Sequence, residues 1–330
     1  MQKLLQFFWF SGVITVVGLV CMYLYGGSAA LFLTALLIVL EVTLSFDNAV
    51  VNARVLRTMS QAWQQRFLTW GMIIAVFGTR FLLPIVIVSL VAWASPWAVA
   101  KLALFDPGAY GALLHSAKDA IHAFGAAFLI MVALKYFFDR EKKVHWISVV
   151  EEHLTMWGRI EAIEIAFALT VLVVMAFLVP LHAATILTAG IVGIVLFTLM
   201  EGVTSAFSIE AKETATHGLT LFLYLNVLDS AFSLDGVVGA FALTTSIPII
   251  AVGLGIGAFF VRSLTVYMVR EHTLDTLKYL EHGAHWAILG LAGSMFVSLV
   301  TEVPEIVTGG IGIVFVVLAY WSSVLARRAP

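Results

Sequence analysis

Long apolar runs constrain the fold of this chain more than any other feature of its sequence. A membrane-spanning helix needs about 20 apolar residues in succession, and the sequence contains about ten runs of this kind. Hydrophobic residues make up 62% of the 330 residues and charged residues only 12%, whereas about a quarter of a soluble domain is charged. We therefore predict an all-α, polytopic transmembrane helix bundle that forms a single membrane domain over residues 1–330.

The predicted spans follow the apolar runs. They cover residues 4–25, 30–53, 67–94, 120–138, 160–180, 184–206, 218–244, 247–269, 284–301 and 305–325. The segment 95–119 contains Pro96 and Pro107 and is too interrupted to span, so we expect a loop there with an interfacial or re-entrant piece. Residues 139–159 form the longest polar stretch, and we expect this stretch to join two halves of the protein.

The positive charges predict the orientation of the spans. With the N-terminus in the cytoplasm, all but four of the 18 Lys and Arg residues fall on the cytoplasmic side. Lys101 and Lys118 fall outside, and Arg80 and Arg262 lie within spans. This bias follows the positive-inside rule and predicts that both termini are cytoplasmic. The net charge of −2 gives no case for nucleic-acid binding, so we expect partners within the membrane.

Two predicted spans carry acidic residues inside an apolar run. In the second span these are Glu41 and Asp47, accompanied by Ser45 and Asn48. A charged side chain at the membrane centre costs about 2.5–3.5 kcal/mol on insertion scales, so these acids must face protein, water or a cation.

The same pattern returns in the seventh span. There Asp229 is followed by Ser233 and Asp235 at the spacing that separates Glu41 from Ser45 and Asp47, and Gly236 comes next. The charge pattern predicts that the two motif spans run in opposite directions across the membrane.

The residues after each motif also correspond. The next span carries one arginine, Arg80 or Arg262, and the third opens with a histidine, His122 or His282. We therefore predict one three-helix unit used twice with inverted orientation, an arrangement that places substrate sites near the midplane at the repeat interface. The predicted organisation is a first repeat unit at 30–138, a connecting loop with extra spans at 139–217, a second, inverted unit at 218–301, and a last span and tail at 302–330.

The acidic motifs offer oxygen ligands for a hard cation. Carboxylate, amide, hydroxyl and carbonyl oxygens suit Mn²⁺, Mg²⁺ and Ca²⁺, whereas zinc or copper favours the histidine and cysteine that the motifs lack. A regular helix would spread these ligands, so we expect local unwinding at residues 45–48 and 233–236. The alternative is that each acid pairs with an arginine or a backbone group to hold the bundle together. Arg80 and Arg262 have two possible roles: they are either counter-ions to these acids in the metal-free state or ion pairs that pack the helices.

Glu201 is a further candidate for an ion pathway. It lies several residues inside the end of the sixth span, and residues 205–210 repeat the pattern of residues 230–235 almost residue for residue. A chance resemblance is the alternative. We expect His282 and His285 near the membrane interface, with a proton relay as the alternative role.

Common enzyme motifs are absent from the sequence. It has no Gly-rich phosphate loop, HExxH or GxSxG pattern, which excludes the commonest ATPase, zincin and serine-hydrolase classes. We expect no enzyme activity and no cofactor, with the divalent cation as substrate. The remaining catalytic alternative is an intramembrane aspartyl hydrolase with Asp47 and Asp235 as its dyad.

The chain resembles the TerC/Alx integral membrane proteins. The resemblance rests on residues 41–49, 229–237 and 124–139 and covers roughly residues 30–320. It is closest to the branch known as a domain of unknown function and often linked with tellurium resistance. The resemblance implies a member of the LysE-like superfamily of small exporters, with inverted three-helix repeats, in the inner membrane of a prokaryotic cell.

The resemblance also implies a set of metal ligands at a midplane site, because several TerC/Alx members are linked to Mn²⁺ efflux. The second motif of this chain begins with Asp rather than Glu and ends in Gly rather than Asn, which bears on ligand number and on the preferred ion. The implied ligands are Glu41, Asp47, Asn48, Asp229 and Asp235.

The leading functional prediction is a divalent-cation exporter that works by alternating access, with Mn²⁺ as the first candidate for its substrate. The alternative is a membrane scaffold or stress-response subunit associated with tellurite resistance, in which the exposed Asp139–Arg159 loop assembles partners. The candidate partners are the lipid bilayer, the divalent ion, further copies of the chain and stress-response membrane proteins.

Overall fold

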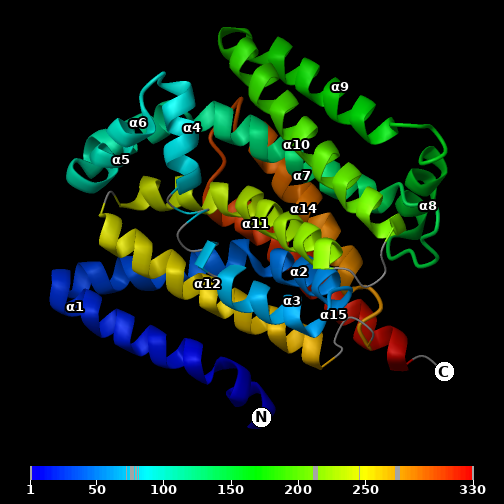
Figure 1. Cartoon of the computed structure of the whole chain (residues 1–330), viewed down its shortest axis with the longest axis horizontal. Helices are drawn as coiled ribbons and strands as arrows, with labels where there is room; N and C mark the ends of the chain where they lie inside the picture. Colours follow the sequence, from blue (N-terminus) through cyan, green and yellow to red (C-terminus); the bar gives the residue numbers. More distant parts are fainter. Residues whose placement is uncertain are drawn as a thin grey trace. The chain divides into compact units, whose positions relative to one another are not determined.

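A computed structural model of the chain describes residues 2–71, 73–74, 78, 80, 82–210, 215–244, 246–271 and 276–328. Every regular element in these ranges is helical, which confirms the all-α prediction (Figure 1). The helices are α1 (Gln2–Leu44), α2 (Phe46–Arg57), α3 (Gln61–Arg66), the π-helix η1 (Phe67–Gly71), α4 (Leu83–Val91), α5 (Pro96–Phe105), α6 (Pro107–Ser116), α7 (Lys118–Phe137), α8 (Ser148–Trp157), α9 (Ile163–Leu178), the 3-10 helix η3 (Pro180–His182), α10 (Ala183–Glu210), α11 (Ala215–Leu243), α12 (Ile247–Arg270), α14 (Leu280–Val297) and α15 (Glu305–Arg328).

Several helices are long and apolar enough to cross a membrane. Among the described residues, five stretches meet this condition by length and composition: Phe7–Leu44, Lys118–Phe137, Pro180–Gly202, Ile247–Arg270 and Gly310–Arg327. The first covers 38 residues and bends at Gly26 and Gly27, where Gly27 has a φ of +67° that suits glycine. The chain is thus an all-helical protein with the helix lengths of a multi-pass membrane protein.

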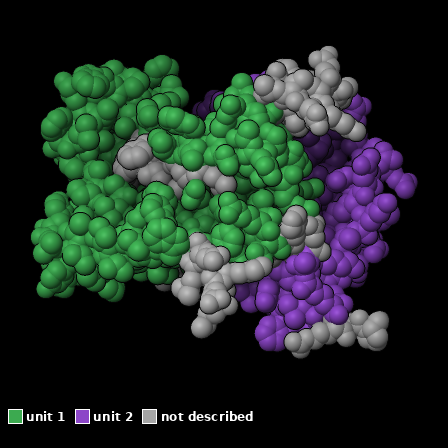
Figure 2. All heavy atoms as spheres, turned by 60° about the horizontal axis from the view of Figure 1, so that its bottom comes forward, with its two compact units in different colours: residues 1–118, 211–271 green, residues 119–210, 272–330 purple. Residues whose placement is uncertain are grey.

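The chain divides into two compact units (Figure 2). Unit 1 contains Met1–Lys118 and Ala211–Glu271, and unit 2 contains Asp119–Glu210 and His272–Pro330. Each unit therefore combines an early and a late part of the sequence.

In unit 1, α1 and α12 pack closely because glycines lie at their contact. A Cβ atom on Gly253 would lie 2.6 Å from Cβ of Leu37, and one on Gly18 would lie 2.5 Å from Ile256. Small residues let membrane helices approach until their backbones are nearly in contact. This close approach brings α12 against the part of α1 that carries Glu41.

The segment 95–119 is helical, so the loop expected there is wrong. Both prolines stand at helix starts, where a backbone N–H would have no acceptor within the helix, so proline costs no hydrogen bond there. The side chains of the preceding residues cap the helices. Ser95 Oγ accepts a hydrogen bond from the Ala98 amide, and Asp106 Oδ1 accepts one from the Ala109 amide. The prolines begin the short helices α5 and α6 instead of interrupting a chain between spans.

In unit 2, α7 is buried along almost its whole length. Gly193 of α10 faces its backbone, since a Cβ there would lie 2.5 Å from the carbonyl oxygen of Phe124. In the same way, Gly283 of α14 faces α15, where a Cβ would lie 2.3 Å from Ala319. Glycine contacts again set the distances between the helices.

The polar stretch 139–159 was expected as a connecting loop, but it contains the helix α8. The carboxylate of Glu151 in α8 accepts hydrogen bonds from the backbone amides of Trp146 (3.2 Å) and Ile147 (3.4 Å), immediately before the helix. A carboxylate in the first turn stabilises a helix start by satisfying free N–H groups.

Candidate functional site

The first acidic motif lies at a break between two helices of unit 1. α1 ends at Leu44 and α2 begins at Phe46, and Ser45 between them has a φ of −105° and a ψ of 13°. Of the local unwinding expected at residues 45–48, the structure shows a departure from helical geometry at Ser45 alone, because residues 46–48 are helical and Ser45 keeps its backbone hydrogen bonds to Glu41 and Ala49. The matching expectation at residues 233–236 is wrong, because α11 is continuous from Ala215 to Leu243.

Glu41 is fully buried beside the break and has two side-chain partners. The Ser45 hydroxyl donates a hydrogen bond to Oε1 of Glu41 (3.0 Å), and the Arg80 guanidinium donates to the same oxygen. Arg80 is buried as well, so each charge of this ion pair compensates the other. The structure thus brings Glu41, Ser45 and Arg80 together.

Two glycines make room for the Glu41 side chain. A Cβ atom on Gly257 of α12 would lie 2.5 Å from both Cβ and Cγ of Glu41, and one on Gly236 of α11 would lie 3.3 Å from Oε2. The carboxylate therefore occupies space that larger residues at these positions would fill. This is a packing reason for glycine at the end of the second motif.

Asp229 connects the second motif to the first. The side-chain amide of Asn48 donates a hydrogen bond to Oδ1 of Asp229 (2.6 Å), and both residues are buried. Asn52, one turn further along α2, lies beside the same carboxylate. The charges of Glu41 and Arg80 also act on the Asp229 carboxylate. We call Glu41, Ser45, Asn48, Arg80 and Asp229 the unit 1 cluster.

The remaining motif residues have different surroundings. Asp47 is buried in the first turn of α2, and its Oδ1 accepts a hydrogen bond from the backbone amide of Asn48 (2.9 Å). Ser233 is buried one turn after Asp229 on α11. The side chain of Asp235 lies outside the described residues. Among those that are described, no three carboxylate, imidazole or thiol groups gather as they would in a preformed metal site.

A narrow cavity of about 30 Å³ adjoins the unit 1 cluster. Its polar lining comes from Ser45, Asn52, Arg80, Asp229, Arg262 and Thr265. A water molecule needs about 10–15 Å³ of such volume, so the cavity has room for one or two waters or for one dehydrated ion. Arg262, predicted as a counter-ion, therefore reaches the same cavity as Arg80.

Four buried oxygen atoms in and beside the cluster have no hydrogen-bond partner within the described part of the chain. Buried polar atoms in proteins are nearly always paired, so a group of unpaired oxygens requires an explanation. Each of the four is an amide, carboxylate or hydroxyl oxygen, and they come from side chains of α2 and α11. They are Asn48 Oδ1, Asn52 Oδ1, Asp229 Oδ2 and Ser233 Oγ.

Glu201 lies on α10 in unit 2. Its carboxylate forms an ion pair with Nζ of Lys135 on α7 at 2.5 Å, and both side chains are partly exposed. The structure therefore gives Glu201 a lysine partner within its own unit.

Comparison with known proteins identifies the family of the chain. Residues 46–330 match a family described as protein of unknown function (DUF475). The chain belongs to the DUF475 family. No curated protein and no solved structure matches it. The DUF475 match begins at Phe46, the first residue of α2, and so includes Asp47, Asn48 and Asp229 but not Glu41.

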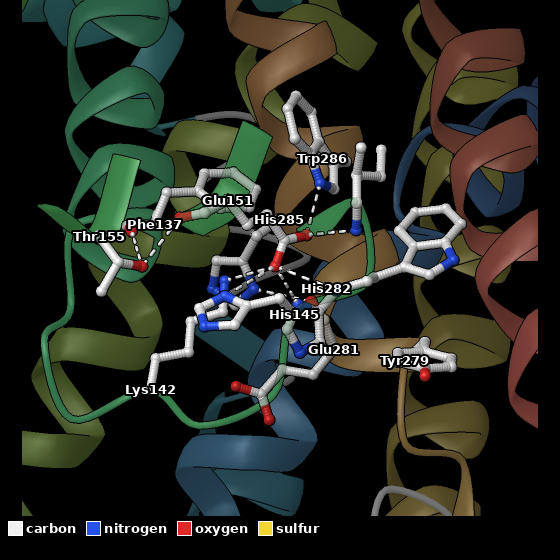
Figure 3. Close-up of polar contacts among 12 residues, drawn as sticks. Phe137, Lys142, His145, Glu151, Thr155, Tyr279, Glu281, His282, His285 and Trp286 are labelled. Atoms are coloured by element: carbon white, nitrogen blue, oxygen red, sulfur yellow. Dashed lines mark hydrogen bonds and ion pairs between the residues drawn. The ribbon is translucent and has the colours of Figure 1, made fainter. Parts of the chain in front are cut away.

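Unit 2 of this DUF475 chain holds a second polar cluster, which the sequence analysis missed (Figure 3). Nδ1 of His282 lies 2.8 Å from Oε2 of Glu151, and the Trp286 indole donates to Oε1 (2.9 Å). Nζ of Lys142 lies 2.9 Å from Oε2, and Nδ1 of His145 lies 3.8 Å from it. We call these five residues the Glu151 cluster.

The two candidate histidines lie at the start of α14, and their place near the membrane interface stays a prediction. His282 and His285 are buried, and the His285 ring stacks on Tyr136 with 3.7 Å between ring centroids. The spacing of His282 and Trp286, one turn apart on α14, was the available signal in the sequence. Nothing in the sequence showed that Glu151 from the polar stretch would contact both.

Proposed function

We propose that this DUF475 protein transports a divalent cation through the unit 1 cluster, without catalysing a chemical reaction. The observation that carries the proposal is the group of four unpaired buried oxygens beside two carboxylates and a narrow cavity. Hydroxyl, amide and carboxylate oxygens are the ligands of hard cations. Mn²⁺ is the first candidate, in keeping with the resemblance to TerC/Alx proteins, and export from the cytoplasm is the proposed direction.

The charges of the cluster support a cation as the substrate. Glu41, Asp47 and Asp229 are buried carboxylates, and Arg80 and Arg262 are the positive groups at the cavity. Arg80 and Arg262 balance Glu41 and Asp229, so the buried Asp47, outside the unit 1 cluster, adds one negative charge that a cation or a proton would compensate. In the proposed cycle, Arg80 pairs with Glu41 when the ion is absent and yields this carboxylate when the ion arrives.

The division into units supports the inverted repeats that the proposal uses. The boundary after Lys118 follows the second span of the first proposed repeat, and the boundary after Glu271 follows the second span of the second. Each repeat thus contributes corresponding spans to the same unit. We propose ten spans, with both termini in the cytoplasm of a prokaryotic cell, and alternating access between the two repeats.

Manganese loading of cells tests the proposed function. We expect Asp229→Asn to slow manganese efflux by at least about 10-fold to 100-fold, the range observed when support of a metal ligand is lost. Asparagine keeps an oxygen for the hydrogen bond from Asn48 but removes the charge. Asp47→Asn and Asp235→Asn should also make cells accumulate manganese.

The matched control for the loading experiment is Glu201→Gln, which changes an acid of unit 2. It should leave efflux within twofold of wild type on the proposed pathway. Efflux at the wild-type rate by a folded Asp229→Asn, Asp235→Asn double variant would refute the proposal.

A further inference from the structure

Helix α8 turns Glu151 and Thr155 toward unit 2, while its other polar side chains, Ser148, Glu152 and His153, are exposed. Glu151 is fully buried in the Glu151 cluster. One turn later, the Thr155 hydroxyl contacts the carbonyl oxygen of Phe137 on α7 (3.3 Å). These two contacts fix which face of α8 is turned toward the protein.

The face of α8 opposite Glu151 carries exposed apolar side chains on both sides of the exposed His153. Val149 is 75% exposed, Met156 50% and Trp157 52%. At 100° per residue, these positions lie between about 120° and 160° from the direction of Glu151. A helix on the surface of a water-soluble protein has its apolar face inward and its polar face outward. The orientation of α8 instead suits an environment that is itself partly apolar.

The Glu151 cluster connects α8 to an end of unit 2 that carries another exposed tryptophan. Glu151 contacts His282 in the first turn of α14. Just before that turn, the backbone amide of Tyr279 donates to Ser323 Oγ near the end of α15 (2.8 Å). Trp321 on this part of α15 is 65% exposed. Tryptophans collect where a membrane meets water, so this end of the candidate span Gly310–Arg327 has the character of an interface.

We propose that α8 lies in the membrane–water interface, with the face formed by Val149, Met156 and Trp157 inserted among the lipids. The bilayer is then the occupant of this face, and the Glu151 cluster holds the helix at the rotation that insertion requires. Short amphipathic helices bind membranes in this way through the apolar area that they bury. This inference does not depend on the proposed cation transport.

The charges around α8 indicate which kind of lipid it contacts. The exposed charged side chains of residues 139–161 are Arg140, Lys143 and Arg159 on the positive side and Asp139, Glu141, Glu152 and Glu161 on the negative side. Because these charges include no positive excess, apolar burial and not attraction to anionic headgroups drives the contact. We therefore expect the same insertion in zwitterionic and in anionic bilayers.

Spin labelling of the full-length protein in phosphatidylcholine nanodiscs tests the proposal. Cys21 is a free, exposed cysteine, so the labels are introduced in a Cys21→Ser background. We expect nitroxides at Met156→Cys and Val149→Cys to collide with oxygen and to lose nearly all collisions with a water-soluble nickel chelate. A label at Glu141→Cys, in the exposed loop before α8, is the control and should collide freely with the chelate.

Two results would overturn this inference. Free access of the nickel chelate to both Met156→Cys and Val149→Cys would place the apolar face in water, where it would be open to a partner protein. Insertion only in nanodiscs that contain anionic phosphatidylglycerol would show that charge, not apolar burial, drives the contact. The two labelled positions lie on the same face of α8, about two turns apart. One misfolded variant therefore does not remove the test.

Discussion

Replacing Glu151 with alanine should lower the free energy of unfolding of the protein by about 3–5 kcal/mol, the cost of breaking a buried charged pair. The carboxylate is fully buried and contacts Lys142, His282 and Trp286. Its removal would leave an ammonium group and two ring N–H donors buried without their acceptor, and α8 would lose its attachment to α14. Thermal unfolding in detergent measures this loss.

Glu152→Ala is the matched control for this prediction, because Glu152 is the next residue and is exposed. Surface substitutions of this kind usually change stability by less than about 0.5 kcal/mol. Equal stabilities of the Glu151→Ala and Glu152→Ala variants would show that the Glu151 cluster does not hold unit 2 together.

The Glu151 cluster should persist in mild acid. Burial alone would raise the pKa of Glu151, but hydrogen bonds from His282, Lys142 and Trp286 outweigh it and hold the pKa well below its ordinary value of 4.5. A pKa that is lowered on folding gives stability that is complete above the ordinary value and is lost only as the pH falls toward the lowered one. The protection factors of the α8 amides, which are corrected for the slower intrinsic exchange in acid, should therefore be the same at pH 5 as at pH 7.

Gly257→Ala should destabilise unit 1 and displace Glu41. The new Cβ would lie 2.5 Å from Cβ and Cγ of Glu41, closer than such atoms can approach, so α12 or Glu41 must move. Overpacking of this kind costs about 1–3 kcal/mol. Because Glu41 belongs to the proposed cation pathway, manganese efflux should fall together with stability.

Gly12→Ala is the control for Gly257→Ala, since a Cβ at Gly12 meets no atom within 4 Å. It should leave both efflux and unfolding unchanged or stabilise α1 slightly, because alanine is the better helix former. Normal efflux by a Gly257→Ala protein would mean that the position of Glu41 does not matter for transport.

The sequence predicted the long helices well because a long apolar run in a membrane satisfies its backbone hydrogen bonds within itself only as a helix. Expected spans at 120–138 and 247–269 correspond closely to α7 and α12. It failed at α5 and α6, where prolines at helix starts were read as interruptions, and at α8, where a polar stretch becomes helical through its contacts with α14. Such contacts depend on residues far away in the sequence.

The acidic motifs could be recognised from the sequence, but their partners could not. The break at Ser45 and the cost of burying Glu41 follow from local composition and from membrane physics. The pair of Asn48 with Asp229 depends on how α2 and α11 pack in unit 1, and the pair of Arg80 with Glu41 depends on how the segment before α4 packs against α1. The glycine contacts that fix this packing are equally invisible without the helix positions.

Electron paramagnetic resonance of Mn²⁺ added to the purified full-length protein tests the central claim most directly. The free ion gives a sharp signal, and the signal is lost on binding. We predict one tightly bound Mn²⁺ per chain in the wild type, weaker binding by at least about tenfold in Asp229→Asn, and wild-type binding in Glu201→Gln. Absence of bound Mn²⁺ in the wild type, or unchanged binding by a folded Asp229→Asn variant, would contradict a cation site at the unit 1 cluster.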